Sequence, residues 1–244
     1  MDVPETVRTA LADRPVEGAV CLDAGAGVGN TTAGLLDAGA RRVYTVTNDR
    51  EHAEAVQERV GVAHRDRVVT VEGDLRETPL ADDSVDLVAV HALFNVVPTA
   101  AFADIAAELT RVAKPGSHLV VDDYDPLPAE AAMRDLFAVE NAAAELSGGE
   151  SALTFYPAAM VRRCFTGEGW TFDGERTLLD PVPWTEDHVS AHADVAREAA
   201  RTLPPKLADP LTAEIEATAR AIGSESAGRM YSLAFRLPDE VGSG

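Results

Sequence analysis

Lysine is scarce in this chain of 244 residues, in which Lys114 and Lys206 are the only two lysines. Lysine and arginine together number 21 against 41 aspartate and glutamate residues, so the net charge is −20 with neutral histidines. Binding to nucleic acid or to an anionic membrane depends on cations that neutralise phosphates, and we therefore expect neither partner. A hydrated acidic surface poor in lysine suits concentrated salt, and we predict a halophilic protein.

Long apolar runs are absent as well. No segment approaches the roughly 20 residues that a membrane-spanning helix needs, and residues 1–18 lack a basic stretch followed by an apolar one. We therefore expect a cytoplasmic protein. Cys21 and Cys164 are the only cysteines and lack metal-ligand spacing, which predicts two small buried side chains and no metal site.

Aromatic residues make up only 5% of the chain, although 46% of its residues are hydrophobic. The core must therefore consist mainly of Ala, Val and Leu, which suits helices packed closely on a sheet. Chains usually divide into domains only beyond roughly 250 residues. We expect residues 1–244 to form a single domain, with a cofactor-binding half over 1–125 and an acceptor-side half over 126–244.

Strand-like and helix-like segments alternate through the first half. Runs such as Val85–Val90 and His118–Val121 are short and nearly continuously apolar, as expected of parallel strands covered by helices on both faces. The pattern therefore predicts an α/β fold with a parallel sheet. After Asp125 the pattern changes, and Ala-rich stretches at 130–147 and 186–203 predict helical insertions, followed by a helix near 211–222 and a strand from Met230.

A glycine-rich segment stands between the first predicted strand and the helix that follows it. Gly25, Gly27 and Gly29 occupy alternate positions between Asp23 and Asn30. Such a loop lets the backbone approach a ligand at the carboxyl end of the strand, where doubly wound sheets bind nucleotides. The dinucleotide fingerprint needs its last glycine where this chain has Asn30, so the spacing favours another adenosyl cofactor over NAD. A tight turn without a ligand is the structural alternative.

The order of later motifs resembles that of the class I S-adenosylmethionine-dependent methyltransferases, of the type 11-like, small-molecule kind. The segment Asp23–Gly29 resembles their first motif, Val71–Val88 is similar to their third and fourth strands, and Glu108–Gly116 resembles the helix and turn before their fifth strand. Ala92–Val96 also looks somewhat like the quinone-biosynthesis C-methyltransferases. The resemblance implies a Rossmann-like doubly wound, seven-stranded, mostly parallel sheet with an antiparallel last strand. It also implies S-adenosyl-L-methionine as cofactor and methyl transfer to a small molecule.

Carried over position by position, the resemblance implies a set of cofactor-binding residues. Asp23 would anchor the glycine loop or the ammonium group of the cofactor, and Asp74 would accept a hydrogen bond from the adenine amino group. The remaining members are Gly25, Ala26, Gly27, Gly29, Asn48, Asp49, Leu75 and His91.

The chain departs from the family where an acid usually binds the ribose, because Thr47 stands there. Either Asn48 or Asp49 would replace that acid, and Asp49 is equally well explained as the cap of the following helix.

Methyl transfer from a sulfonium needs a base only if the acceptor must lose a proton. We predict His91 and Tyr124 as catalytic residues, since they follow the fourth and fifth predicted strands. Other candidates are Asp122, Asp123, His188 and His192. The two late histidines share a helical face but lack the glutamate of the zinc-protease pattern, and we expect a surface helix. Magnesium at Asp122, Asp123 and Asp125 is disfavoured because no acid follows the fourth strand.

The two helical insertions would lie above the carboxyl edge of the sheet and exclude water from a small-molecule acceptor. Scarce aromatics at predicted strand ends or in insertions would wall its pocket or fill the core: Phe94, Tyr124, Phe155, Tyr156 and Trp184. Two rival functions are a non-catalytic cofactor-binding regulatory module and a nucleotide-dependent oxidoreductase. A homodimer is left open.

Overall fold

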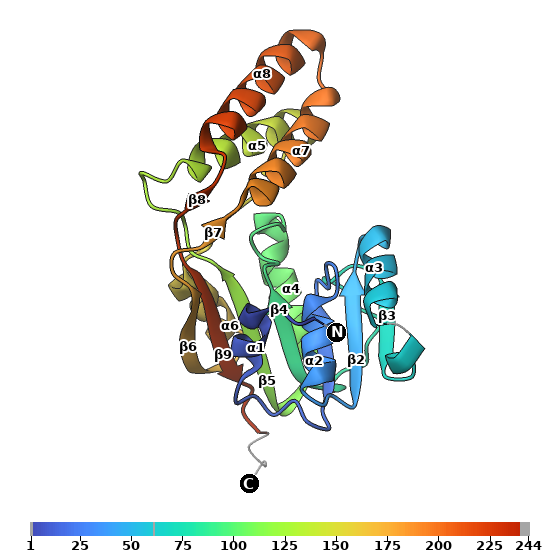
Figure 1. The fold of residues 1–244 in the computed structure, drawn as a ribbon. Helices are drawn as coiled ribbons and strands as arrows, with labels where there is room; N and C mark the ends of the chain where they lie inside the picture. Colours follow the sequence, from blue (N-terminus) through green and yellow to red (C-terminus); the bar gives the residue numbers. More distant parts are fainter. Residues whose placement is uncertain (1, 61, 240–244) are drawn as a thin grey trace.

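A seven-stranded sheet forms the centre of the molecule in the computed structural model, which describes residues 2–60 and 62–239 (Figure 1). The strands follow the order β3-β2-β1-β4-β5-β9-β6. Five of them pair in parallel, and β9 runs antiparallel to both of its neighbours. Their bounds are β1 Val20–Ala24, β2 Arg42–Thr47, β3 Val68–Glu72, β4 Val85–His91, β5 Ala113–Tyr124, β6 Thr171–Leu179 and β9 Met230–Arg236. The predicted doubly wound fold with an antiparallel last strand is confirmed.

Helices cover both faces of this sheet because its central strands are apolar on both sides. On β1, Cys21 packs into the core cluster of one face and Leu22 into that of the other, and both are fully buried. One face carries α1 (Glu5–Leu11), α2 (Asn30–Asp37) and α3 (Arg50–Val60); the other carries α4 (Phe102–Val112) and α6 (Ala158–Gly167). Short 3-10 turns lie at Val62–His64 and Thr99–Ala101.

The helix α1 lies directly on α2. Gly34 of α2 leaves the space that Val7 of α1 fills, and a Cβ atom on Gly34 would collide with Val7 Cγ1. Arg176 on β6 also donates hydrogen bonds to the carbonyls of Thr9 (3.1 Å) and Ala12 (3.2 Å) at the end of α1. The first helix is therefore fixed both to its neighbour and to the edge strand.

Three helices form a separate bundle above the carboxyl edge of the sheet (Figure 1): α5 Met133–Gly148, α7 Glu186–Arg201 and α8 Pro205–Ile222. A small two-stranded sheet of β7 (Pro183–Trp184) and β8 (Glu225–Ser226) lies at its base. Phe137, Trp184 and Ile215 belong to its buried core. The predicted insertions are thus one bundle, and none of the helices in the described residues has the length and hydropathy that spanning a lipid bilayer requires.

Two sequence predictions for this part of the chain need correction. The helix predicted to begin near Leu211 begins at Pro205, because proline is well tolerated in the first helical turn and the helix continues through Pro210. Cys164, predicted to be buried like Cys21, is only half-buried on α6.

Candidate active site

A cavity of about 860 Å³ opens at the carboxyl edge of the sheet. Its walls come from the segments that follow β1, β2, β3 and β4 and from the start of α4. Ligand sites of doubly wound folds lie at this edge, and the volume is within the usual range for small-molecule sites. Seven of the predicted site residues line it: Gly25, Ala26, Gly27, Asn48, Asp74, Leu75 and His91. Asp23, Gly29, Asp49 and Tyr124 lie outside its lining.

The glycine loop presents bare backbone to the cavity. Gly25, Gly27 and Gly29 have φ angles of +81°, +47° and +81°, a left-handed region that favours glycine. The amides of Gly25 and Ala26 donate to the Val46 carbonyl at 3.0 and 3.1 Å, which ties the loop to β2. A Cβ atom on Gly25 would lie 2.6 Å from Leu93 Cδ1, whereas one on Gly27 would meet no atom within 4 Å. The space beside Gly27 is therefore free for a ligand.

Asp23 lies buried at the end of β1, beneath this loop. Thr32 Oγ1 donates to its Oδ2 at 2.5 Å, while Oδ1 is buried without a hydrogen-bond partner among the described residues. Burial raises the pKa of Asp23 to about 6, partly opposed by the Thr32 hydrogen bond and the charge of His91. An unpartnered buried carboxylate oxygen beside bare backbone fits a ligand that brings a cationic group.

In the segment after β2, Asn48 and Asp49 are the two candidates for binding the ribose, and they have different surroundings. Asp49 Oδ1 accepts from the backbone amides of Glu51 (2.7 Å) and His52 (3.2 Å), so Asp49 caps α3. The hydrogen bonds from His52 and Glu51 lower the pKa of Asp49. Thr47 and Asn48 line the cavity instead. The geometry favours Asn48, whose role toward a ribose stays a prediction.

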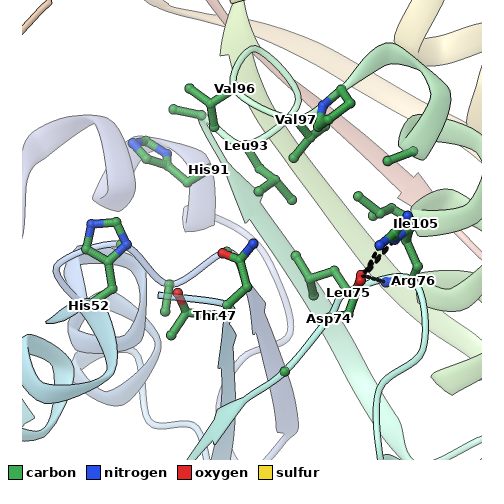
Figure 2. Close-up of a pocket in the computed structure, with 18 of the residues that line it drawn as sticks. Thr47, His52, Asp74, Leu75, Arg76, His91, Leu93, Val96, Val97 and Ile105 are labelled. Atoms are coloured by element: carbon green, nitrogen blue, oxygen red, sulfur yellow. Dashed lines mark hydrogen bonds and ion pairs between the residues drawn. The ribbon is translucent and has the colours of Figure 1, made fainter. Parts of the chain in front are cut away.

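Asp74 lines the cavity beyond β3 but is not free. Its carboxylate accepts from the Arg76 amide at 2.8 Å and pairs with the Arg76 guanidinium at 2.6 Å (Figure 2). These contacts lower the pKa of Asp74. Leu75, next in the chain, is buried and presents an apolar surface. Arg76 was not predicted as a site residue, although it stands two residues after Asp74 and could have been expected near it.

His91 ends β4 and lines the cavity. Its Nδ1 lies 3.0 Å from Oδ2 of Asp122, which is its direct partner in the β4–β5 register. Burial works against the charged imidazole, but the Asp122 hydrogen bond and the charges of Asp122, Asp23 and Asp123 outweigh it and raise the pKa of His91. The parallel pairing of β4 and β5 thus builds an imidazole–carboxylate pair at the cavity.

Asp123 is buried next to this pair. It accepts from the backbone amides of Asn95 (3.1 Å) and Tyr124 (2.8 Å), which holds the turn after β4 in place. Burial raises the pKa of Asp123 to about 7, partly opposed by these hydrogen bonds.

Tyr124, the second predicted catalytic residue, packs between Phe155 and Trp184, with ring centroids 6.4 and 5.4 Å apart. Burial, with a smaller effect of the Asp123 charge, raises the pKa of Tyr124 to about 12. Its side chain therefore belongs to the base of the bundle, and its catalytic role stays a prediction.

The late histidines also belong to the bundle. His188 forms a capping box with Thr185 at the start of α7, and His192 Nδ1 lies 2.8 Å from the buried Glu140 of α5. Asp125 pairs with Arg229 at 2.6 Å. Within the described part of the chain, no group of three or more His, Cys, Asp or Glu side chains is placed to hold a metal ion.

An apolar wall completes the cavity. Figure 2 shows Leu93, Val96 and Val97 on one side and Thr47 and His52 on the other. Val96 is 53% exposed at the opening, which leaves apolar surface for a ligand. These aliphatic residues were not predicted. The aromatics predicted instead pack in or against the core clusters and do not line the cavity: Phe94, Phe155, Tyr156 and Trp184.

The sheet order, with the glycine loop and the cavity at its carboxyl edge, is that of the fold of class I S-adenosylmethionine-dependent methyltransferases. Residues 22–121 match the family described as the methyltransferase domain. These residues are the part of the chain that is similar to this family, and S-adenosylmethionine is the cofactor that the class uses. The bare backbone at Gly27 and the unpartnered oxygen of Asp23 fit this group.

Similar proteins support the assignment over half of the chain. A demethylmenaquinone methyltransferase of Clavibacter sepedonicus is 36% identical over 123 residues, which are 50% of this chain and 48% of the relative. A ribosomal RNA small subunit methyltransferase A of Xanthobacter autotrophicus is 32% identical over 39% of this chain and 34% of its own length. The chain therefore spans about half or less of the length of these relatives.

Among solved structures, the [4+2]-cyclase SpnF has a TM-score of 0.66 at 16% identity, covering 96% of this chain and 81% of its own. At this identity the likeness shows the fold alone.

Proposed function

We propose that this protein transfers the methyl group of S-adenosylmethionine to a small-molecule acceptor bound against the Leu93–Val97 wall. The observation that carries the proposal is the free space beside Gly27 in the lining of the cavity. When bound, the cofactor supplies an electrophilic methyl group on a sulfonium. The chain's own contribution is to hold donor and acceptor in line and to exclude water, which accounts for much of such a rate.

Every predicted cofactor residue except His91 has a role toward the cofactor in this proposal. The backbone of Gly25, Ala26 and Gly27 holds the methionine part, and Gly29 turns the chain into α2. Asp23 attracts the ammonium group from beneath the loop. Asn48, supported by the Asp49 cap, binds the ribose, while Asp74 and Leu75 hold the adenine.

The surface chemistry supports a small acceptor over a nucleic acid. The cavity lining includes the carboxylates Asp74, Asp104 and Glu150 and one guanidinium, that of Arg76. A phosphate backbone would meet net repulsion there. The quinone methyltransferase named among the relatives is consistent with an apolar acceptor. We further propose that the protein works in a salt-rich cytoplasm, and we leave its oligomeric state open.

Calorimetric titration with S-adenosylhomocysteine tests the cofactor site. We expect the wild type to bind S-adenosylhomocysteine and not NADH. Gly27→Leu should abolish this binding with the fold intact, because its side chain fills the ligand space. Gly18→Leu is the matched control, since Gly18 has a φ of +74° and open surroundings at the opposite end of the same strand. Equal affinities for the two variants would refute the site.

A non-catalytic binding module is the competing function. Both functions predict binding of S-adenosylhomocysteine, but only an enzyme moves label. Incubation of the protein with methyl-labelled cofactor and a metabolite extract should yield a labelled small molecule. The Gly27→Leu variant should yield none.

A further inference from the structure

The His91–Asp122 pair includes a buried carboxylate that a contact between His91 and the cofactor would not require. Its Nδ1 faces Asp122, so Nε2 is the ring nitrogen left for other partners, and it makes no hydrogen bond within the described residues. Asp122 is 4% exposed and its Oδ1 is buried without a partner in the same part of the chain. Removing a carboxylate from water is costly unless the charge is paired, and here His91 Nδ1 is the partner of Asp122 Oδ2.

The surroundings of the pair favour an imidazolium. Three carboxylates act on His91: Asp122 and Asp123 from β5 and Asp23 from β1. His52 also lines the cavity, and it pairs with Asp49 at 3.8 Å. A positive charge that forms on His91 is therefore stabilised from two strands without any movement of the backbone.

We propose that Nε2 of His91 accepts a proton from the methyl acceptor. Asp122 orients the His91 ring for this step and stabilises the positive charge that forms on it. The acceptor is accordingly a group that must lose a proton, such as a weakly acidic hydroxyl. The inference rests on the proposed methyl transfer. It adds the acceptor class and the role of Asp122.

The step balances within the cavity. The acceptor O–H bond breaks and its proton passes to Nε2 of His91. The electron pair left on oxygen forms the bond to the methyl carbon, while the carbon–sulfur bond breaks and its pair stays on sulfur. Asp122 keeps Nδ1–H oriented, so that Nε2 is the basic nitrogen.

The test follows the histidine ring signals of the full-length protein by NMR as the pH is varied. His91→Gln identifies the His91 signal by its disappearance. In the complex with S-adenosylhomocysteine, we expect this signal to titrate above the ordinary histidine range. Asp122→Asn keeps a polar partner but removes the charge, and should lower the midpoint by about one pH unit or more.

A second ligand probes where Nε2 lies. Sinefungin carries an amino group in place of the transferred methyl group. Its ammonium form would repel an imidazolium beside it, so the His91 midpoint should be lower with sinefungin than with S-adenosylhomocysteine. Equal midpoints in the two complexes would overturn the proposal. This comparison uses the wild type and does not depend on whether Asp122→Asn folds.

The chain offers a matched control in the bundle, where Glu140 and His192 form a similar buried pair. Glu140→Gln should leave the His91 midpoint unchanged, and a shift equal to that of Asp122→Asn would overturn the role of Asp122. If the wild type binds neither ligand, the proposed function fails, while the free protein still shows whether Asp122 controls His91. A labelled product methylated on a tertiary amine or thioether, which carry no proton to lose, would refute the acceptor class.

Discussion

Buried carboxyl groups make the stability of this protein depend on pH. The pKa of Asp123 is raised to about 7, so the folded state holds its proton at pH values where the unfolded chain has lost it. The contribution of this group to stability is full at low pH and is lost as the pH rises through the raised pKa.

Replacement of Asp123 by asparagine should remove this dependence. The difference in unfolding free energy between wild type and Asp123→Asn should shift in favour of the variant by roughly 2 to 3 kcal/mol from about pH 5 to about pH 8. Denaturant unfolding at several pH values measures it. A difference that is constant, or that moves the other way, would contradict the buried state of Asp123.

Asp74 gives a second test at the same scale. Asp74→Ala should weaken S-adenosylhomocysteine binding by about 1 to 2 kcal/mol, the net value of one hydrogen bond to a charged group. Asp82→Ala removes a comparable exposed aspartate paired with Arg111 and should leave the affinity unchanged. If calorimetry gives the same small loss of affinity for both variants, Asp74 only stabilises its own turn and does not bind the cofactor.

Sequence motifs located this site only in part. The place of the glycine loop at the cavity was predictable because left-handed backbone restricts which residues can stand there. The roles of Asp23 and Asp74 toward a cofactor stay predictions. Sequence left the choice between Asn48 and Asp49 open, since a carboxylate before a helix serves equally as a ligand and as a cap. The Asp122 contact to His91 depends on the strand register, which no local pattern encodes.

Among the elements, α1 and α2 pack closely against each other at Gly34. Gly34→Val should lower the unfolding free energy by about 1 to 3 kcal/mol, because the new side chain overlaps Val7 in a full core. Thermal or denaturant unfolding measures the loss. Adding Val7→Ala should recover part of it, and additive losses in the double variant would contradict the contact.

Elements that are neighbours both in the sequence and in space were easier to predict than those that meet only in space. The strands and helices through β5 alternate with clear punctuation, and their order was predicted. The bundle was not recognised as one unit, because its helices are separated in sequence by α6 and β6 and meet only in space. The β7–β8 pair was missed because its two short strands carry too few residues for a periodic pattern.

At the scale of the whole molecule, the net charge of −20 determines how stability should depend on salt. Carboxylates outnumber cations nearly twofold, so self-repulsion opposes the folded state in dilute buffer. We expect the unfolding free energy to increase as KCl is raised from dilute buffer to molar concentrations, with sucrose at matched viscosity as the control. Maximal stability in dilute buffer would refute adaptation to salt.

The position of β9 between β5 and β6 affects how a nascent chain must behave on the ribosome. Both neighbours are synthesised well before residues 230–236 emerge, and until then each presents an unpaired backbone edge to its surroundings. In the described residues β6 pairs with β9 alone, so residues 230–236 are what joins this edge strand to the rest of the sheet.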